Sequence, residues 1–147
     1  MEKRIALFAG TFDPFTRGHH NLVLRALSMF DRVVVAVGCN IGKSCMFAVE
    51  ERVAAIEAVY AGEARVSVMS YSGLTIDVAK EVGATVLLRG VRSVKDFEYE
   101  REIADVNRQI GGIETVLLLS APEYASLSSS VVRELIVYGK DVSSLLP

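Results

Sequence analysis

The residues best suited to chemistry near the start of the chain run from Gly10 to His19, and they read Gly-Thr-Phe-Asp-Pro-Phe-Thr-Arg-Gly-His. An apolar run precedes them and a helical pattern follows, so we expect a strand to enter a helix through a glycine-containing turn. Such a turn brings free backbone N–H groups to the positive end of a helix, which suits a phosphate group. The spacing matches neither the dinucleotide motif G-x-G-x-x-G nor the P-loop. His19 and His20 lie about 100° apart on a helix, so we expect only His19 to face such a site, as a neutral donor.

Three cationic side chains offer positive charge for an anion. Arg89 and Arg92 flank a glycine directly after a buried apolar run, and two guanidinium groups in this arrangement favour a bidentate phosphate clamp. Lys43 lies in the loop after the second apolar run, where a flexible ammonium group would reach the same ligand. Further along, Ser128 to Ser130 precede the last helical pattern. One of these serines caps that helix, and the spare hydroxyl and N–H groups predict a second phosphate site.

The chain alternates short apolar runs with helical patterns, and this alternation determines the fold that positions these residues. We predict strands at 4–9, 32–38, 65–70, 84–88 and 115–119, and helices at 19–30, 49–61, 75–82, 94–110 and 129–138. The pattern predicts an α/β fold, a doubly wound (Rossmann-like) parallel sheet of order 3-2-1-4-5 with helices on both faces. Ligands bind such sheets beyond the carboxyl ends of the strands, where the strand order reverses. We therefore expect the loops after the first and fourth strands to meet at one site.

The fourth predicted helix carries an apolar stripe and an acidic stripe. The apolar residues recur at intervals of three and four, which predicts a seam against the core or against a partner helix. This stripe consists of Tyr99, Ile103, Val106 and Ile110. In this interpretation the acidic residues form the solvated face of the helix, namely Asp96, Glu98 and Glu102.

Size and composition exclude several classes of protein. The chain has 147 residues, for which we expect one domain over 1–147, and its 51% hydrophobic content fits a sheet covered on both faces. No apolar run approaches the ~18 residues of a membrane span and no secretory leader opens the sequence, so we expect no membrane association. A net charge of −2 argues against nucleic acid as a partner. Cys39 and Cys45 lack metal-ligand spacing, and we interpret them as small apolar side chains in a reducing cytoplasm.

Taken together in chain order, these motifs resemble the bacterial phosphopantetheine adenylyltransferase family of the nucleotidylyltransferase superfamily. The Thr-x-Gly-His ending of the first motif is typical of the superfamily. More selective are Lys43 before Met-Phe, the run Glu-Glu-Arg-Val at 50–53, and Arg-Gly-Val-Arg at 89–92 leading into Asp-Phe-Glu-Tyr-Glu at 96–100. The serines at 128–130 complete the series. The resemblance implies transfer of AMP from ATP to 4′-phosphopantetheine, which yields dephospho-CoA and pyrophosphate in the penultimate step of coenzyme A biosynthesis.

The resemblance also implies roles for individual residues. His19 stabilises the transition state, and Lys43 and Arg92 are further catalytic residues. The residues expected to surround ATP are Thr11, Phe12, His19, Gly90, Val91, Arg92, Glu100, Tyr124, Ala125, Ser126, Leu127, Ser128, Ser129 and Ser130. Those expected to bind phosphopantetheine are Thr11, Lys43, Thr75 and Arg89. The family further implies Mg²⁺ bound through phosphates and water rather than through side chains, binding of dephospho-CoA or CoA, and assembly as a homohexamer.

The implied reaction needs few catalytic groups, because its nucleophile is a phosphate monoester that is already anionic at neutral pH. The protein must hold two anions in line and neutralise the charge that develops on the transferred phosphoryl group. Two other interpretations remain open. The chain could be a different nucleotidylyltransferase, acting on nicotinate mononucleotide or glycerol phosphate, or a non-catalytic module that binds nucleotide or CoA.

Overall fold

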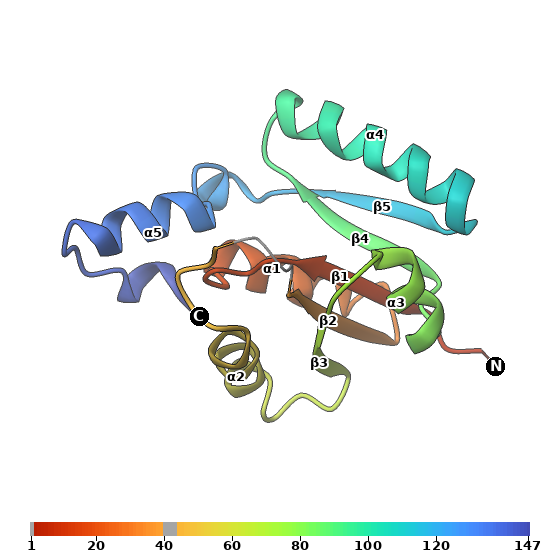
Figure 1. Cartoon of the computed structure of the whole chain (residues 1–147), viewed down its shortest axis with the longest axis horizontal. Coiled ribbons are helices and arrows are strands. Elements are labelled where there is room, and N and C mark those ends of the chain that lie inside the picture. Colours follow the sequence, from red (N-terminus) through yellow and green to blue (C-terminus); the bar gives the residue numbers. More distant parts are fainter. Residues whose placement is uncertain (1, 40–43) are drawn as a thin grey trace.

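The computed structural model describes residues 2–39 and 44–147, and its centre is a parallel sheet (Figure 1). The strands are β1 (Ile5–Gly10), β2 (Arg32–Gly38), β3 (Val66–Tyr71), β4 (Val86–Val91) and β5 (Glu114–Leu119). They pair in the order β3-β2-β1-β4-β5, and every pairing is parallel. The predicted fold class and strand order are confirmed. The order reverses between β1 and β4, so the carboxyl ends of these two strands mark the expected ligand site.

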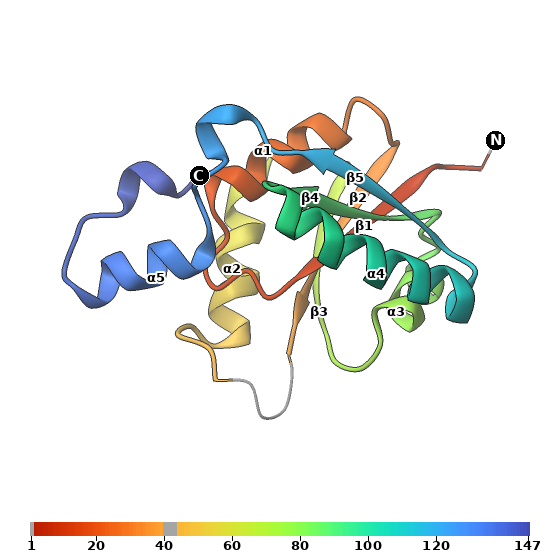
Figure 2. The same ribbon diagram turned by 90° about the horizontal axis from the view of Figure 1, so that it is seen from above.

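Helices cover both faces of this sheet. The main helices are α1 (Arg17–Ala26), α2 (Val49–Val59), α3 (Thr75–Val82), α4 (Val94–Gly111) and α5 (Ser129–Val137). Short 3₁₀ turns span Pro122–Tyr124 and Ser143–Leu145. Figures 1 and 2 show α1 and α2 on one face of the sheet and α3 and α4 on the other. Among the described residues, no helix is long and apolar enough to cross a membrane.

The core consists of two apolar layers, one on each face of the sheet. Successive residues of a strand point to opposite faces, so Phe8 joins the layer beneath α1 and α2 while Leu7 joins the layer beneath α3. Ile56 anchors α2 in the first layer and Ile76 anchors α3 in the second. Burial on both faces explains why β1 and β2 read as continuous apolar runs rather than as alternating sequences.

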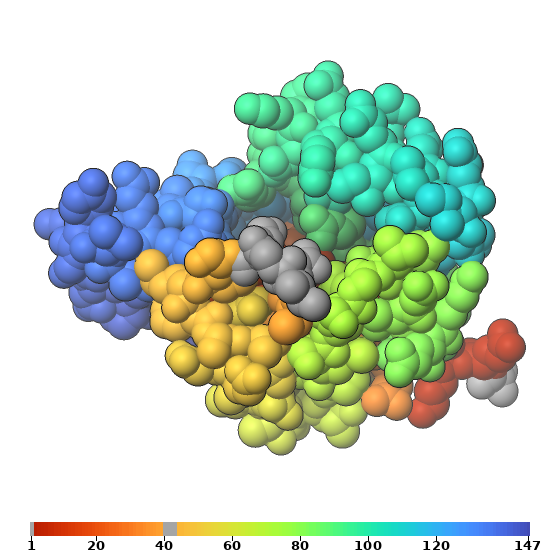
Figure 3. Space-filling view, viewed as in Figure 1, coloured from red at the N-terminus to blue at the C-terminus, as the bar shows by residue number. Residues whose placement is uncertain are grey.

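Helix α5 lies apart from the sheet and docks on the β1–α1 loop. Both ribbon views place α5 at one end of the molecule, and Figure 3 shows this C-terminal part as a lobe of its own. Ser129 Oγ donates to the carbonyl of Pro14 at 2.7 Å, and Arg133 Nη1 donates to the carbonyl of Asp13 at 2.8 Å. Val132 of α5 is fully buried. These contacts bring the start of α5 to the end of β1.

The structure corrects one expectation from the sequence and narrows another. Strand β4 does not end at 88 but continues to Val91, which pairs with Leu119 of β5, so Arg89 and Gly90 lie within the strand rather than in a turn after it. Three residues of the apolar stripe of α4 lie outside the core, because 62% of Tyr99, 50% of Val106 and 65% of Ile110 are exposed, and the predicted alternative of a seam against a partner helix stays a prediction. The fourth residue of the stripe, Ile103, lines a cavity on the side of α4 that faces the sheet, together with Glu100, Ala104 and Asn107.

Candidate active site

The β1–α1 loop has an unusual backbone that shapes the site. Phe12 adopts a left-handed conformation with φ of 51°, and the Asp13–Pro14 peptide bond is cis. Thr16 then caps α1, so this helix begins at Arg17, two residues earlier than the sequence predicts. The Thr16 hydroxyl accepts the N–H of His19, and Nδ1 of His19 accepts the N–H of Thr16 at 2.9 Å. This reciprocal pair is a capping box in which histidine takes the place of the usual Glu or Gln.

The capping box determines the state of the His19 imidazole. Because Nδ1 accepts a backbone N–H, the ring proton is assigned to Nε2, which leaves a donor at the other end of the ring. The ring packs against Phe12 and Phe15, with centroid separations of 5.1 and 5.4 Å. Burial, followed by the positive charges of Arg89 and Arg92, lowers the pKa of His19 to about 4. At neutral pH His19 is therefore an uncharged hydrogen-bond donor.

A cleft of about 360 Å³ opens at the carboxyl ends of β1 and β4. Most of the sequence-predicted site residues line it together. They are Thr11, Phe12, His19, Arg89, Gly90, Arg92, Glu100, Tyr124, Leu127, Ser128, Ser129 and Ser130. A Cβ atom at Gly90 would collide with the end of the Leu22 side chain, so glycine leaves room for Leu22 of α1 against β4 beside this cleft.

Four predicted site residues do not line this cleft. Val91 is buried, with 4% of its surface exposed, whereas Ala125 and Ser126 are exposed outside the lining. Thr75 lies in a neighbouring cavity. Lys43 falls outside the described residues, so its predicted role stays a prediction.

Arg89 is held in a fixed orientation by a carboxylate on α4. Its Nε and Nη2 donate to the two oxygens of Glu100, both at 2.8 Å, and Nη1 donates to the carbonyl of Ala9. Burial alone would lower the pKa of Arg89, but the hydrogen bonds and negative charge of Glu100 raise it. Three of the five guanidinium N–H groups are thereby used. The Glu100 carboxylate, which we expected near ATP, binds Arg89 through both of its oxygens.

Arg92 follows β4 and is oriented by the first turn of α4. Its Nε donates to Asp96 Oδ2 at 3.1 Å, and its backbone N–H donates to the same oxygen at 3.2 Å. Ser93 caps α4, accepting the backbone N–H of Asp96. Asp96 thus lines the cleft and is not merely part of a solvated face, as the acidic stripe predicted. Tyr99 also lines the cleft. The sequence signal that could have indicated this is its spacing from Asp96, because residues three apart on a helix share a side.

A second cavity of about 250 Å³ adjoins the cleft. The two share Ala9, Gly10, Thr11, Arg89 and Glu100, so the Arg89–Glu100 ion pair forms part of the boundary between them. Tyr71 and Thr75 lie on the far side of this boundary, and their hydroxyl groups are hydrogen-bonded at 3.2 Å. The cleft and the second cavity are therefore adjoining spaces that meet at Arg89.

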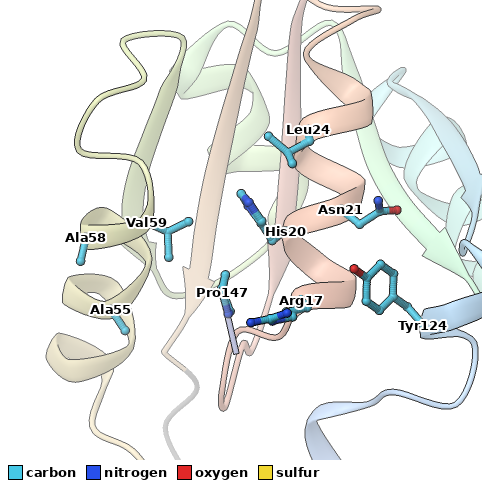
Figure 4. A pocket seen from close by; sticks show the side chains of 9 residues that line it. All are labelled: Arg17, His20, Asn21, Leu24, Ala55, Ala58, Val59, Tyr124 and Pro147. Atoms are coloured by element: carbon cyan, nitrogen blue, oxygen red, sulfur yellow. The ribbon is translucent and has the colours of Figure 1, made fainter. Parts of the chain in front are cut away.

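A third hollow of about 610 Å³ lies between α1 and α2, away from His19. Figure 4 shows Arg17 and His20 on α1 across this groove from Ala55 on α2. Nδ1 of His20 is hydrogen-bonded to the Tyr60 hydroxyl at 2.9 Å, and burial lowers the pKa of His20. Adjacent histidines on α1 thus point to different sides of the helix. Only His19 lines the cleft.

The cleft is rich in hydrogen-bond donors, and its carboxylates are paired with cations. Asp96 binds Arg92 and Glu100 binds Arg89. The first turn of α5 adds the backbone N–H groups of a helix N-terminus and serine hydroxyls. The Ser128 hydroxyl accepts the N–H of Val131 as the helix cap, and the Ser130 hydroxyl accepts Nη2 of Arg133. Within 2–39 and 44–147, no three His, Cys, Asp or Glu side chains are grouped to hold a metal ion. The site is suited to binding anionic phosphate groups.

Sequence comparisons relate the chain to known enzymes over its whole length. The family model for cytidylyltransferase-like proteins matches residues 7–135. A phosphopantetheine adenylyltransferase of Porphyromonas gingivalis is 52% identical over 147 residues, which cover 100% of this chain and 96% of the relative. The enzyme of the same name from Bacteroides fragilis is 51% identical over 144 residues, covering 98% of this chain and 96% of the relative.

Solved structures at low sequence identity share the fold. A bifunctional NMN adenylyltransferase/ADP ribose pyrophosphatase from Francisella tularensis superposes with a TM-score of 0.71 at 14% identity, covering 99% of this chain and 44% of that protein. A putative nicotinate-nucleotide adenylyltransferase from Vibrio parahaemolyticus gives a TM-score of 0.65 at 21% identity, covering 99% and 94%. These likenesses support the Rossmann-like architecture.

Proposed function

Because this chain belongs to the cytidylyltransferase-like family, and within it to the phosphopantetheine adenylyltransferases, we propose that its cleft transfers AMP from ATP to 4′-phosphopantetheine. The products are dephospho-CoA and pyrophosphate. The chain is a nucleotidyltransferase. The observation that carries the assignment of the site is the convergence of His19, Arg92 and the start of α5 on one cleft, beside a second cavity bounded by Arg89.

Each substrate is assigned to one of the two adjoining spaces. ATP occupies the cleft, with its phosphates against the β1–α1 loop, Arg92 and the serine-rich start of α5. Phosphopantetheine occupies the second cavity, with Thr75 along its length and its phosphate directed toward Thr11 and Arg89. Lys43 completes the acceptor site in this proposal. The Arg89–Glu100 boundary is where the acceptor phosphate meets the α-phosphorus of ATP.

The protein promotes transfer by positioning and by electrostatic stabilisation. The acceptor phosphate attacks the α-phosphorus of ATP, the bond between that phosphorus and the oxygen bridging it to the β-phosphate breaks, and pyrophosphate leaves with that oxygen and the electron pair. The neutral His19 donates its Nε2–H to an oxygen on which negative charge accumulates. Arg92, fixed by Asp96, offers its remaining N–H groups to the departing phosphates. No side chain needs to remove a proton, because the nucleophile is already an anion.

We propose that Mg²⁺ accompanies ATP. The cleft carboxylates, Asp96 and Glu100, are each bound to an arginine, and this donor set fits an ion held by phosphate oxygens and water rather than by the protein. When bound, the ion shares the negative charge of the triphosphate. No described side chain is assigned as its ligand.

The proposal extends to the organisation of the protein. We infer one nucleotidyltransferase domain over 1–147, a homohexamer, and a cytoplasmic location. The exposed apolar residues of α4, among them Val106 and Ile110, support association between subunits. Cys39 and Cys45 are free thiols, which fits a reducing compartment.

An acceptor screen tests the choice of substrate. The protein is incubated with α-labelled ATP and Mg²⁺ together with 4′-phosphopantetheine, nicotinate mononucleotide or glycerol phosphate in separate reactions. Label is expected in dephospho-CoA alone. Preferential transfer to one of the other two acceptors would assign a different nucleotidylyltransferase activity. Binding of ATP without transfer to any acceptor would indicate a non-catalytic module.

A further inference from the structure

We propose that Arg52, a residue of α2 outside the cleft lining, is a positioning residue for this reaction. It fixes the Thr11–Phe12 peptide so that the N–H of Phe12 points toward the bound phosphates. The inference rests on the proposed function in one respect only, namely that a phosphorylated nucleotide occupies the cleft.

Arg52 donates hydrogen bonds to backbone carbonyls of three separate segments. Its side chain is buried, with 6% of the residue exposed. Nη1 donates to the carbonyl of Thr11 at 2.7 Å and to the carbonyl of Gly38 at 2.9 Å, while Nε donates to the carbonyl of Phe47 at 3.0 Å. The first of these carbonyls belongs to the β1–α1 loop and the second to the end of β2. A single guanidinium group therefore sets the position of the loop relative to the sheet.

The bond to the Thr11 carbonyl determines where the next N–H points. A trans peptide is planar, with its C=O and N–H on opposite sides. Since the carbonyl of Thr11 faces Arg52, the N–H of Phe12 faces away from Arg52, toward the cleft that Thr11 and Phe12 line. The chain continues from this peptide through the left-handed backbone of Phe12, with φ of 51°. Such a conformation is unfavourable for a bulky residue and persists only where surrounding bonds hold it.

Arg52 also places a positive charge behind the loop. No ion pair formed within residues 2–39 and 44–147 includes Arg52, and its partners there are carbonyl oxygens. A buried cation without a carboxylate partner attracts an anion across a low-dielectric region. The nearby buried carboxylate, Asp13, is directed elsewhere and accepts the N–H groups of Met46 and Phe47 at 2.8 and 2.9 Å. The orientation of the peptide and the field of the guanidinium therefore act in the same direction on a phosphate in the cleft.

The test compares Arg52→Met and Arg52→Lys with the wild-type protein. Affinities for ATP and for adenosine are measured by calorimetry without acceptor, and turnover is measured by pyrophosphate release. Both changes are expected to weaken ATP binding, by about 10- to 100-fold for Arg52→Met, with adenosine affinity unchanged. Arg52→Lys keeps the charge and cannot reach all three carbonyls, so it is expected to recover part of the ATP affinity and part of kcat. Arg65→Met is the matched control, because Arg65 also donates to a carbonyl but lies at the opposite end of the sheet.

The two affinities separate positioning from simple loss of structure. An equal fall in ATP and adenosine affinity, or unchanged binding of both in a folded Arg52→Met variant, would overturn the proposal. If Arg52→Met does not fold, the same comparison is made with Arg52→Lys. The binding measurements do not depend on which acceptor the enzyme uses. A failure of the proposed function would instead appear as wild-type protein that binds ATP and does not release pyrophosphate with 4′-phosphopantetheine.

Discussion

Replacing His19 by alanine removes two hydrogen-bonding groups that have different tasks. Nδ1 accepts the N–H of Thr16 in the cap of α1, and Nε2 carries the proton that we assign to the transition state. Loss of the cap bond is expected to cost about 1 kcal/mol of folding stability. Loss of the donor is expected to lower kcat by ~10²- to 10³-fold, equivalent to about 2.7–4 kcal/mol, and to leave ATP affinity nearly unchanged.

His19→Gln separates these two effects. Glutamine at the third position of a helix restores the capping box, because its side-chain oxygen accepts the N–H of the capping threonine. We therefore expect His19→Gln to recover the stability that His19→Ala loses, as measured by urea unfolding. Its kcat is expected to remain low, because the flexible amide, with its oxygen bound to the N–H of Thr16, does not hold an N–H in the rigid ring position of Nε2–H.

The assay is steady-state pyrophosphate release with both substrates saturating, combined with calorimetry of ATP binding. Turnover of His19→Ala within a factor of a few of the wild type would refute the catalytic role. A loss of turnover that follows the loss of stability in both variants would show that His19 acts only through the cap.

Three other predictions concern the acceptor, pH and folding. Arg89→Ala and Lys43→Ala are expected mainly to weaken binding of 4′-phosphopantetheine, and calorimetry that shows loss of ATP binding alone would reverse the assignment of the two spaces. The pKa of His19 is lowered from 6.5 to about 4 in the folded protein. Between pH 6.5 and pH 4, His19 is therefore protonated in the unfolded chain but not in the folded protein. Stability should fall as pH decreases from 6.5 to 4, by up to about 3 kcal/mol from this residue, and an equally steep fall in His19→Gln would contradict this origin. Asp13→Asn is expected to lose about 1–3 kcal/mol in urea unfolding, because the buried carboxylate accepts two N–H groups and an amide oxygen satisfies only one, and unchanged stability would show that these bonds contribute little.

Much of the fold could be predicted because buried segments have recognisable apolar patterns in the sequence. Strands covered on both faces must be apolar throughout, so β1 and β2 stand out as continuous runs. The approach of the β1–α1 loop to β4 then follows from the strand order. The exact end of β4 does not follow, because Arg89 remains in the strand through pairing with Leu117 of β5, and no local signal reports the pairing partner.

The details of the site were less accessible, because they depend on how each helix is rotated about its axis. Periodicity indicates that Asp96, Tyr99 and Glu100 share a side of α4, but not that this side faces a ligand cleft. The bond from Arg89 to Glu100 joins a strand to a helix and has no sequence signature of its own. Arg52 belongs to a recognisable Glu-Glu-Arg motif, yet its burial against three carbonyls becomes apparent only when the loops are in place.

The most direct test of the central claim is pyrophosphate release from ATP and Mg²⁺, measured with and without 4′-phosphopantetheine. We expect release only when the acceptor is present, in equal amount to the dephospho-CoA formed. Release at the same rate without the acceptor, or none with it, would contradict the account of two anions brought together at the boundary between the cleft and the second cavity.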